Sequence, residues 1–434
     1  MKNIQLIITI VFGALAVLGL FSFAGIIPKP GASNTAKITG NLTIWGTVPK
    51  ANMDKFLQQY FSPDYSDIHI TYVPKNSATF ASNIIEALAA GKGPDMVILP
   101  NDLIVRFSDK IELFTPAMYT ERTFRDTFIQ AGEIFIQPGE GILALPFSVD
   151  PMVMYWNRDI FTSGGIVEPP KYWDQFLTLS PILTKKSESK EISQSAVAFG
   201  EFRNVTHSKD ILAMLMLQTG NPMVIRRPGN VFLPVFMGSN EQRIPPVSEV
   251  FRFYTDFADP LNMAYSWNRS LPESKNLFIA GKLAVYFGYA SEISSIQAKN
   301  PNLNFDVALV PQVRDSANRS TFGRVSGLAT MKTSPNKSLA LYTAQIFSSS
   351  KYSEYISSTL ATPSPNRSVL AKGTANPFMK VFYDSALISK TWFDLRPELT
   401  DGLFQQTVES ISSGKSTVVD AVGKLQADFS VLTQ

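Results

Sequence analysis

Cysteine is absent from the 434-residue sequence, and histidine occurs only as His69 and His207. Without cysteine there is no disulfide, no thiolate zinc or iron–sulfur site, no cysteine nucleophile and no lipid-modified cysteine. A histidine-based metal site or triad would have to use one of the two histidines, and neither lies in an HExxH or paired-histidine motif. The sequence therefore disfavours most enzyme chemistry, and we expect no metal and no cofactor.

Charge of either sign is also sparse. The chain has 39 Lys and Arg against 36 Asp and Glu, a formal net charge of +3, and charged residues make up only 17%. So small an excess gives no electrostatic footprint for nucleic acid. Hydrophobic residues reach 45%, which is enough to bury a large core and excludes a mainly disordered chain. At this length two domains, or two lobes, are expected.

One long hydrophobic run lies at the N-terminus, where Ile4 to Ile27 contains no charged residue. As a helix at about 1.5 Å per residue it would span roughly 36 Å, more than a hydrocarbon core of about 30 Å. Signal peptides carry a shorter apolar core of about 7–15 residues, so residues 1–28 are predicted to be an uncleaved membrane anchor. The alternative is cleavage after Ala24, which follows Ser22-Phe23 and would leave a secreted or periplasmic protein. Either way, we expect the bulk of the chain outside the cytoplasm.

Residues 29–40 are rich in Pro, Gly, Ser and Thr and are predicted to form a tether. The next sixty or so residues alternate between strand and helix patterns. Strands are expected at 41–45, 68–73 and 95–99, with helices at 54–60 and 80–90. This rhythm is typical of a mostly parallel α/β sheet, and it stops near Pro146.

A second α/β region follows. Strands are expected at 195–199, 283–287 and 305–309, and helices at 174–179, 207–218 and 247–258. An apolar stretch after Gly323 precedes a helix at 338–348 and a helical tail from Pro377 onward. No second hydrophobic run is long enough to span a membrane, so the sequence is not that of a channel or transporter pore.

Aromatic residues are abundant, with 5 Trp, 14 Tyr and 31 Phe, and several stand at junctions between expected elements. The junction aromatics are Trp45, Trp156, Trp267, Tyr289 and Trp392. In open α/β sheets, ligands bind at the carboxyl ends of strands. Aromatic faces beside Asp, Asn and Thr suit sugar rings, because the ring covers the C–H patch while polar groups bind the hydroxyls. Each aromatic could instead belong to the core, and Trp45 is assigned there.

Four ordered motifs resemble family 1 extracellular solute-binding proteins of the maltose-binding type. Gly91-Lys-Gly-Pro-Asp95, with an apolar strand running to Asp102, is the first. The others are the segment 144–159 (ALPFSVDPMVMYWNRD), the helix start 169–176 (PPKYWDQF) and the strand 278–286 (FIAGKLAVY). Each motif alone is weak, whereas their order across residues 41–434 is specific.

The resemblance implies two α/β lobes in a type II-like periplasmic-binding-protein fold, joined by hinge crossovers. The crossovers are expected at 148–150, at 323–326 and after 361–365. The first lobe would be 41–148 with 325–361, and the second 149–324 with 362–434. Such a protein binds a solute in the cleft between its lobes and closes around it. The implied function is capture of a carbohydrate, expected to be an oligosaccharide, by a monomeric non-enzyme for the permease subunits of an ABC importer.

The resemblance also assigns ligand-binding positions. Asp102 matches a carboxylate that faces sugar hydroxyls, Asp150 an acidic crossover position, and Trp156 and Trp392 aromatic cleft positions, while Thr47 is a looser match. Together with the junction aromatics Trp267 and Tyr289, these form the predicted site. The family's tryptophans after the strand 278–286 are replaced by Phe287-Gly-Tyr-Ala-Ser-Glu292, so maltodextrin specificity is not implied.

Two other functions remain open at this point. The same fold could bind a polyamine, a peptide or a phosphodiester, for which a cleft with carboxylates and no stacking aromatics would be typical. An exported glycan-active enzyme would need two carboxyl groups facing each other at about 5–10 Å across the cleft.

Overall fold

The structure is a computed structural model that describes residues 39–220, 222–227, 229, 231–235 and 246–432. The chain divides into two units, Met1–Gly40 and Asn41–Gln434, and the elements below belong to the second, with β1 beginning at Gly40. The predicted anchor 1–28, and the tether up to residue 38, lie outside the described residues. No helix within the described ranges is long and apolar enough to cross a membrane.

The strands of the described residues form one large sheet and two small ones. The sheet of eleven strands has the order β2-β1-β3-β14-β7-β12-β9-β8, with β13 paired to β7 and both β4 and β15 paired to β14. Its strands are β1 (Gly40–Gly46), β2 (Ile68–Pro74), β3 (Met96–Pro100), β4 (Ile111–Glu112), β7 (Leu145–Asn157), β8 (Lys185–Lys186), β9 (Ile192–Val197), β12 (Leu283–Tyr289), β13 (Phe305–Ala308), β14 (Thr321–Met331) and β15 (Ser389–Lys390). The short pairs are β5 (Ile136–Gln137) with β6 (Gly141–Ile142) and β10 (Val224–Arg227) with β11 (Val231–Pro234).

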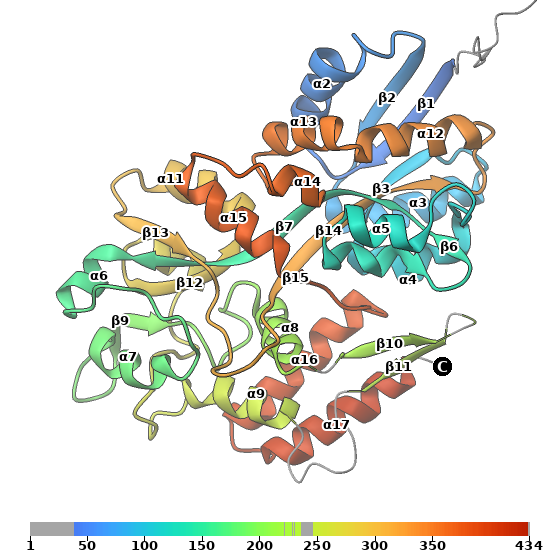
Figure 1. The fold of residues 1–434 in the computed structure, drawn as a ribbon. Helices are drawn as coiled ribbons and strands as arrows, with labels where there is room; N and C mark the ends of the chain where they lie inside the picture. The colour runs from blue at the N-terminus through green and yellow to red at the C-terminus, as the bar shows by residue number, and fades with distance from the viewer. Residues whose placement is uncertain (1–38, 221, 228, 230, 236–245, 433–434) are drawn as a thin grey trace, which may run out of the picture. The chain divides into compact units, whose positions relative to one another are not determined.

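The helices surround this sheet, as Figure 1 shows. In the first half of the chain they are α2 (Lys50–Phe56), α3 (Phe80–Ala89), α4 (Ile104–Phe107), α5 (Glu121–Thr127), α6 (Arg158–Ser163), α7 (Gln175–Leu183) and α8 (Ser208–Gln218). In the second half they are α9 (Pro246–Asp256), α10 (Ser274–Ile279), α11 (Ile293–Lys299), α12 (Lys337–Ser348), α13 (Ser350–Leu360), α14 (Arg367–Leu370), α15 (Pro377–Leu387), α16 (Pro397–Ser412) and α17 (Val418–Val431).

The predicted strand–helix alternation over residues 41–99 is confirmed, and β1 and β3 pair in parallel. The expectation of a mostly parallel sheet is incomplete, because β14 pairs antiparallel with both β3 and β7. These long return strands are too far from β1–β3 in sequence for a local pattern to pair them. Helix α13, which packs on α2, was not predicted.

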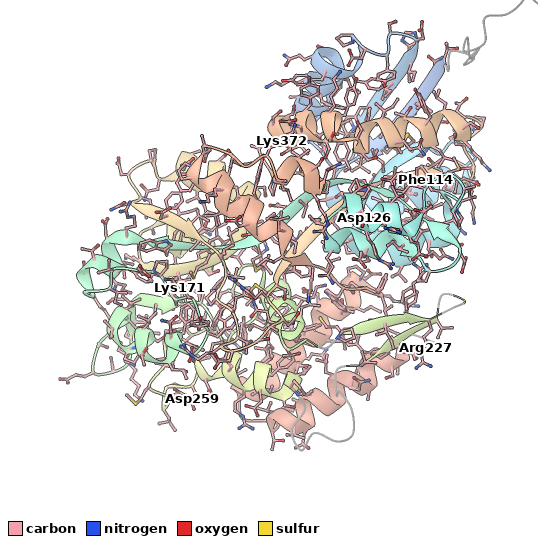
Figure 2. The ribbon with its side chains drawn as sticks, viewed as in Figure 1. Phe114, Asp126, Lys171, Arg227, Asp259 and Lys372 are labelled. Carbon is pink, nitrogen blue, oxygen red and sulfur yellow. The ribbon has the colours of Figure 1, made fainter. Side chains whose placement is uncertain are left out.

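Strands β7 and β14 each contribute to two hydrophobic cores. The first core includes Val149 of β7 and Val325 of β14. The second begins with Met152 of β7 and includes Phe322 of β14. Phe114, labelled in Figure 2, is fully buried in the first core. The chain is therefore an α/β protein with two lobes, and the β7–β14 pair runs through both of them.

Gly323 tests the packing of these shared strands. A Cβ atom at this position would lie 2.7 Å from Ser389 Cβ on β15, closer than side chains approach each other. We expect Gly323→Ala to lower the free energy of unfolding by about 1–3 kcal/mol, since β15 must shift away from β14. Gly402→Ala in α16 is the matched control: nothing lies within 4 Å of its added Cβ, so this change should be neutral or stabilising. Urea denaturation of both variants measures the difference, and equal stabilities would contradict the packing.

Candidate functional site

A cavity of ≈ 1160 Å³ lies where β7 and β14 pass from one lobe to the other. One side is lined by residues that follow β1 and β3, including Thr47 and Asp102. Since these two strands are parallel, their carboxyl ends meet at the same edge of the sheet, where α/β proteins bind ligands. Residues 148–150 of β7 and 324–326 of β14 complete this side, and α8 and α16 line the other.

The strand register explains why these polar residues meet. Ser326 of β14 lies opposite Pro100 of β3 on one side and Ser148 of β7 on the other. Asp150 lies opposite Arg324 in the same β7–β14 pair. All of these residues line the cavity. These polar side chains therefore lie on β7 and β14 between the two hydrophobic cores.

Among the described residues, two buried oxygen atoms in the cavity lining have no hydrogen-bond partner. They are Oδ1 of Asp102 and Oγ1 of Thr362, and Thr362 is only 8% exposed. A buried polar atom without a partner costs roughly 1–3 kcal/mol. Burial also raises the pKa of Asp102, and the nearby Asp394 raises it further, while Arg324 and Lys209 lower it. A bound molecule that donates hydrogen bonds here would relieve both atoms.

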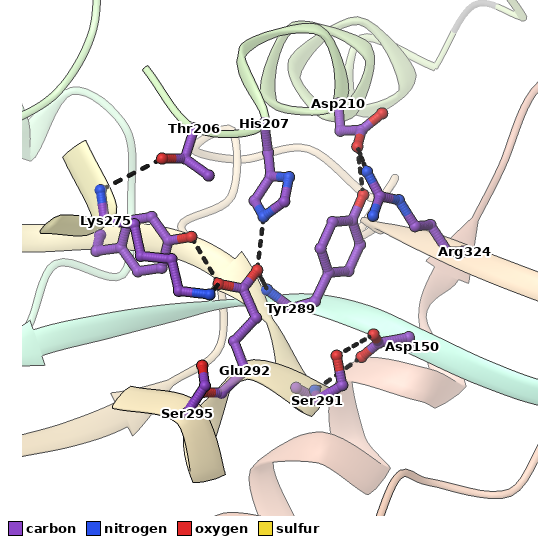
Figure 3. A network of polar contacts seen from close by, with 12 residues as sticks. Asp150, Thr206, His207, Asp210, Lys275, Tyr289, Ser291, Glu292, Ser295 and Arg324 are labelled. Atoms are coloured by element: carbon purple, nitrogen blue, oxygen red, sulfur yellow. Dashed lines mark hydrogen bonds and ion pairs between the residues drawn. The ribbon is translucent and has the colours of Figure 1, made fainter. Parts of the chain in front are cut away.

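Asp210, Tyr289 and Arg324 form a polar cluster beside the cavity (Figure 3). Arg324 Nη2 lies 2.6 Å from Asp210 Oδ2, and the Tyr289 hydroxyl donates to the same oxygen at 2.6 Å. The guanidinium lies 4.1 Å above the Tyr289 ring. Burial and the neighbouring Asp210 hold the pKa of Tyr289 well above its ordinary value, so its phenol stays protonated and keeps donating. The cluster fixes the Arg324 guanidinium in place.

Glu292 anchors a second cluster next to the first (Figure 3). Its Oε1 lies 2.5 Å from His207 Nε2 and its Oε2 lies 2.6 Å from Lys275 Nζ. The Tyr289 backbone N–H also donates to Oε1, at 3.1 Å. Burial raises the pKa of Glu292, but the contacts with His207 and Lys275 outweigh it and lower the pKa to about 2. His207 itself has a left-handed backbone (φ 62°) and lines the cavity, so Glu292 holds a cavity residue from behind.

Asp150 is held by the short helix that follows β12. The Ser291 backbone N–H donates to its Oδ1 at 3.0 Å, and the Ser291 hydroxyl donates to its Oδ2 at 2.6 Å. Burial raises the pKa of Asp150 to about 6, although both Ser291 contacts and the nearby Arg324 lower it. This carboxyl group therefore changes its charge at weakly acidic pH.

Lys209 and Asp394 form the third polar group of the lining. Lys209 Nζ lies 2.9 Å from Asp394 Oδ2, and the Thr400 hydroxyl donates to Oδ1 at 2.7 Å. Burial raises the pKa of Asp394, while Lys209 and Thr400 lower it. The pair connects α8 to the segment before α16, so it fixes the wall of the second lobe.

Four predicted site residues line the cavity: Thr47, Asp102, Asp150 and Trp392. Trp392 is 5% exposed, and its ring packs against Phe404 and Phe429 of the second core. Most of its ring is therefore buried in the second core, and only a small part of it is exposed at the cavity. That these four residues contact a solute stays a prediction.

The other three predicted residues do not line the cavity. Trp156 lies six residues beyond Asp150 on β7, roughly 20 Å along an extended strand, and packs against Phe161. Tyr289 is 1% exposed and lies behind Arg324. Both side chains support the second lobe instead of facing the cleft.

Trp267 is fully buried, which differs from the expectation drawn from its polar surroundings. Its indole N–H donates to Asn204 Oδ1 at 3.1 Å. The polar neighbours are satisfied internally: the Ser266 hydroxyl donates to the Val197 carbonyl and the Asn268 amide to the Tyr265 hydroxyl. A polar segment can therefore lie inside the core when its own hydrogen bonds are made there.

Several lining residues were not predicted. These are Asn101, His207, Lys209, Asp210, Ser291, Arg324, Thr362 and Asp394. Arg324 falls inside the crossover expected at 323–326, and Thr362 lies in the segment 361–365, just before the third expected crossover, so attention to polar residues at and beside the hinges would have found both. His207, Lys209 and Asp210 begin a helix, and nothing in their local pattern marks them as facing a cavity.

The Glu292 cluster predicts a dependence of stability on pH. The folded-state pKa of about 2 lies below the ordinary value of 4.5, so the contribution is present above pH 4.5 and lost as the pH falls towards 2. We expect Glu292→Gln to lower the free energy of unfolding by about 3 kcal/mol at neutral pH, with a difference from wild type that shrinks below pH 4.5. Urea denaturation from pH 7 to pH 2.5 measures this, with Glu188→Gln on an exposed loop as control. A difference independent of pH would contradict the assignment.

A substitution at Trp267 tests whether this side chain stabilises the core or contacts a bound molecule. We expect Trp267→Ala to lower the free energy of unfolding by about 3–5 kcal/mol, because it empties a fully buried site. Folded protein carrying the substitution should bind the same small molecules as wild type. Thermal unfolding gives the stability, and calorimetric titration gives the binding. A variant of unchanged stability with lost binding would place Trp267 at the cleft after all.

Comparison with known proteins gives the family of this chain. The family described as bacterial extracellular solute-binding protein matches residues 50–342. A galactooligosaccharide-binding protein of Bacillus subtilis is 21% identical over 346 residues, which cover 79% of this chain and 77% of that protein.

Solved structures agree in fold. The cyclic alpha-maltosyl-1,6-maltose binding protein of Arthrobacter globiformis superposes with a TM-score of 0.73 at 15% identity, covering 91% of this chain and 99% of its own. The GacH receptor of Streptomyces glaucescens gives a TM-score of 0.68 at 16% identity, with coverage of 91% and 99%. At such identities the likeness shows the fold. Because the family match covers well over half of the sequence, the chain belongs to the bacterial extracellular solute-binding proteins.

Proposed function

We propose that the protein captures a carbohydrate, an oligosaccharide, in the cavity between its lobes and delivers it to the permease subunits of an ABC importer. The observation that carries this proposal is the pair of partnerless buried oxygens, Asp102 Oδ1 and Thr362 Oγ1, in the lining of one cavity. A carboxylate accepts hydrogen bonds, and a threonine hydroxyl both donates and accepts them. Sugar hydroxyls are suited to both roles.

The size and composition of the cavity agree with this ligand class. A volume of ≈ 1160 Å³ exceeds that of a typical small-molecule site, about 300–1,000 Å³, and leaves room for more than one sugar ring. Trp392 and Phe322 supply apolar surface among the polar groups, and such surface suits the C–H patches of a sugar.

The relatives support the sugar class by their descriptions. The Bacillus subtilis relative is named for galactooligosaccharide, and the Streptomyces glaucescens receptor was solved in complex with acarbose. The Arthrobacter globiformis protein is named for cyclic alpha-maltosyl-1,6-maltose. These ligands are all oligosaccharides or their analogues, although their linkages differ.

The mechanism we infer is closure of two lobes, 41–148 with 325–361 and 149–324 with 362–434, around the solute. A solute that bridges both lobes binds the closed form better than the open one and so shifts the population towards it. The two hydrophobic cores divide β7 between Val149 and Met152, one residue later than this division, and so support it there. Within 362–434, Leu370 and Ala386 belong to the first core, so this segment contacts both lobes. The permease would then recognise the outer surface of the closed form.

Location follows from the family, whose members are described as extracellular. We propose that the monomer is held at the membrane by residues 1–28, or is released if the chain is cleaved after Ala24. In this role the protein binds its solute without chemical conversion. Product release from an incubated glycan would instead support the enzymatic alternative.

Thr362 gives a direct test. Thr362→Val removes the partnerless hydroxyl and keeps the shape of the side chain, so we expect no loss of stability but a roughly twofold to tenfold weaker affinity for the solute. Thr343→Val is the matched control, since Thr343 in α12 also has a buried hydroxyl without a partner and lies outside the cavity lining. Calorimetric titration with a panel of oligosaccharides, polyamines and peptides measures both variants.

Three outcomes separate the alternatives. Binding of an oligosaccharide that weakens in Thr362→Val but not in Thr343→Val would support the proposal. Binding only of polyamines or peptides would keep the fold and overturn the sugar class. Equal effects of both substitutions would show that the solute does not reach Thr362.

A further inference from the structure

Carboxylates outnumber cationic side chains around the cavity. The carboxylates in its lining are Asp102, Asp150, Asp210, Asp394 and Asp401. The cations are Arg203, Lys209 and Arg324. A neutral sugar needs no such excess of negative charge, because its hydroxyls bind equally well to amides and neutral hydroxyl groups.

Each of these three cationic side chains already forms an ion pair with a carboxylate of the protein. Lys209 pairs with Asp394 at 2.9 Å and Arg324 with Asp210 at 2.6 Å. Arg203 pairs at 2.7 Å with Glu409, which does not line the cavity. Within the described residues, none of these cations forms an ion pair with the remaining carboxylates, although Arg324 and Lys209 lie close enough to lower the pKa of Asp102.

Three lining carboxylates therefore have no ion pair within the described part of the chain. Asp150 accepts two hydrogen bonds from Ser291, and Asp401 is exposed to solvent. The Oδ1 atom of Asp102 is buried from solvent and accepts no hydrogen bond from the described residues. A buried carboxylate is costly to ionise. Burial, followed by the nearby Asp394, raises the pKa of Asp102 against the opposing effect of Arg324 and Lys209.

We propose that the solute is an amino sugar oligosaccharide whose ammonium group lies against Asp102, with Asp401 as a second, more exposed carboxylate. The inference rests on the proposed carbohydrate function and names the class of sugar. An ammonium group brings N–H donors to an oxygen that has no donor among the described residues, and a positive charge to a carboxylate that forms no ion pair there. The sugar hydroxyls would then be left for Thr362.

Other ligand classes fit the same residues less well. A neutral or N-acetylated sugar can donate to Asp102 but does not offset its charge. A polyamine offsets the charge, but it presents no hydroxyl to Thr362 and no ring to the apolar surface of Trp392. Of these ligand classes, only a sugar that carries an amine offers a cation to Asp102, a hydroxyl to Thr362 and a ring to the apolar surface of Trp392.

The experiment compares three trisaccharides that share a β-1,4-linked glucose-type backbone and differ at carbon 2. They carry a free amine (glucosamine), an N-acetylated amine or a hydroxyl (cellotriose). Calorimetric titration of the purified full chain at pH 6.5 and low salt, with spermidine as a non-sugar cation, gives the dissociation constants. We expect the free-amine trisaccharide to bind at least tenfold more tightly than the other two, and the advantage to shrink at high salt.

Variants assign the advantage to particular carboxylates. Asp102→Asn, which keeps the shape of the side chain, should remove most of the preference for the free amine, and Asp401→Asn should reduce it about twofold. Asp401 lies on the surface, so its variant stays informative if Asp102→Asn fails to fold. Asp126→Asn is the control, because Asp126 lies on α5 (Figure 2), outside the cavity lining.

The outcomes distinguish this inference from the proposed function. Equal or tighter binding of cellotriose or the N-acetylated sugar would overturn the amino-sugar inference and leave the sugar function standing. A preference for the free amine that survives both Asp102→Asn and Asp401→Asn would also overturn it. Binding of spermidine alone, or of none of the four compounds, would count against the carbohydrate function itself and hence against the inference.

Discussion

The antiparallel pairing of β7 with β14 is the constraint on which the rest of the structure depends. Each strand passes from one hydrophobic core to the other within a few residues, since Val149 belongs to the first core and Met152 to the second. Between the two cores, side chains of the pair that line the cavity include polar ones, and the register brings Asp150 opposite Arg324 and Ser148 opposite Ser326. The cavity lies here because the sheet is continuous while its hydrophobic covering is not.

Polar residues in such a gap have to be held in place by other polar residues. Tyr289 does so from behind the cavity: its ring lies under Arg324, its hydroxyl donates to Asp210, and its backbone N–H donates to Glu292. Glu292 in turn holds His207. The aromatic ring thus acts as a support that fixes the charged groups, rather than as a stacking surface for the solute. Because buried polar networks are stabilising only when every member is satisfied, the atoms left without partners at the cavity, above all Asp102 Oδ1, mark where the solute is expected.

The sequence predicted the parts of this arrangement that depend on local pattern. The alternation of strands and helices over residues 41–99 and the Asp102 position after β3 could be inferred from nearby residues. Contacts such as Asp210 with Arg324, separated by 114 positions, carry no local signal, because they arise only when β14 returns beside β7. Trp267 shows the opposite error: its polar neighbours suggested a surface, but they hydrogen-bond to backbone and side-chain groups within the lobe. Composition around an aromatic residue does not tell whether the polar groups face water or each other.

The location of the charges links the fold to selectivity. In an open cleft, water solvates the carboxylates at little cost, so the open form need not discriminate between solutes. In the proposed mechanism, closure would remove that water and lower the local dielectric, which would raise the free energy of any carboxylate left without a donor. A solute that satisfies Asp102 therefore stabilises the closed form more than the open one, whereas a solute that fills the cavity without satisfying it does not. Since only differential affinity can shift the two populations, the partnerless oxygen would make closure itself the step at which the solute is recognised.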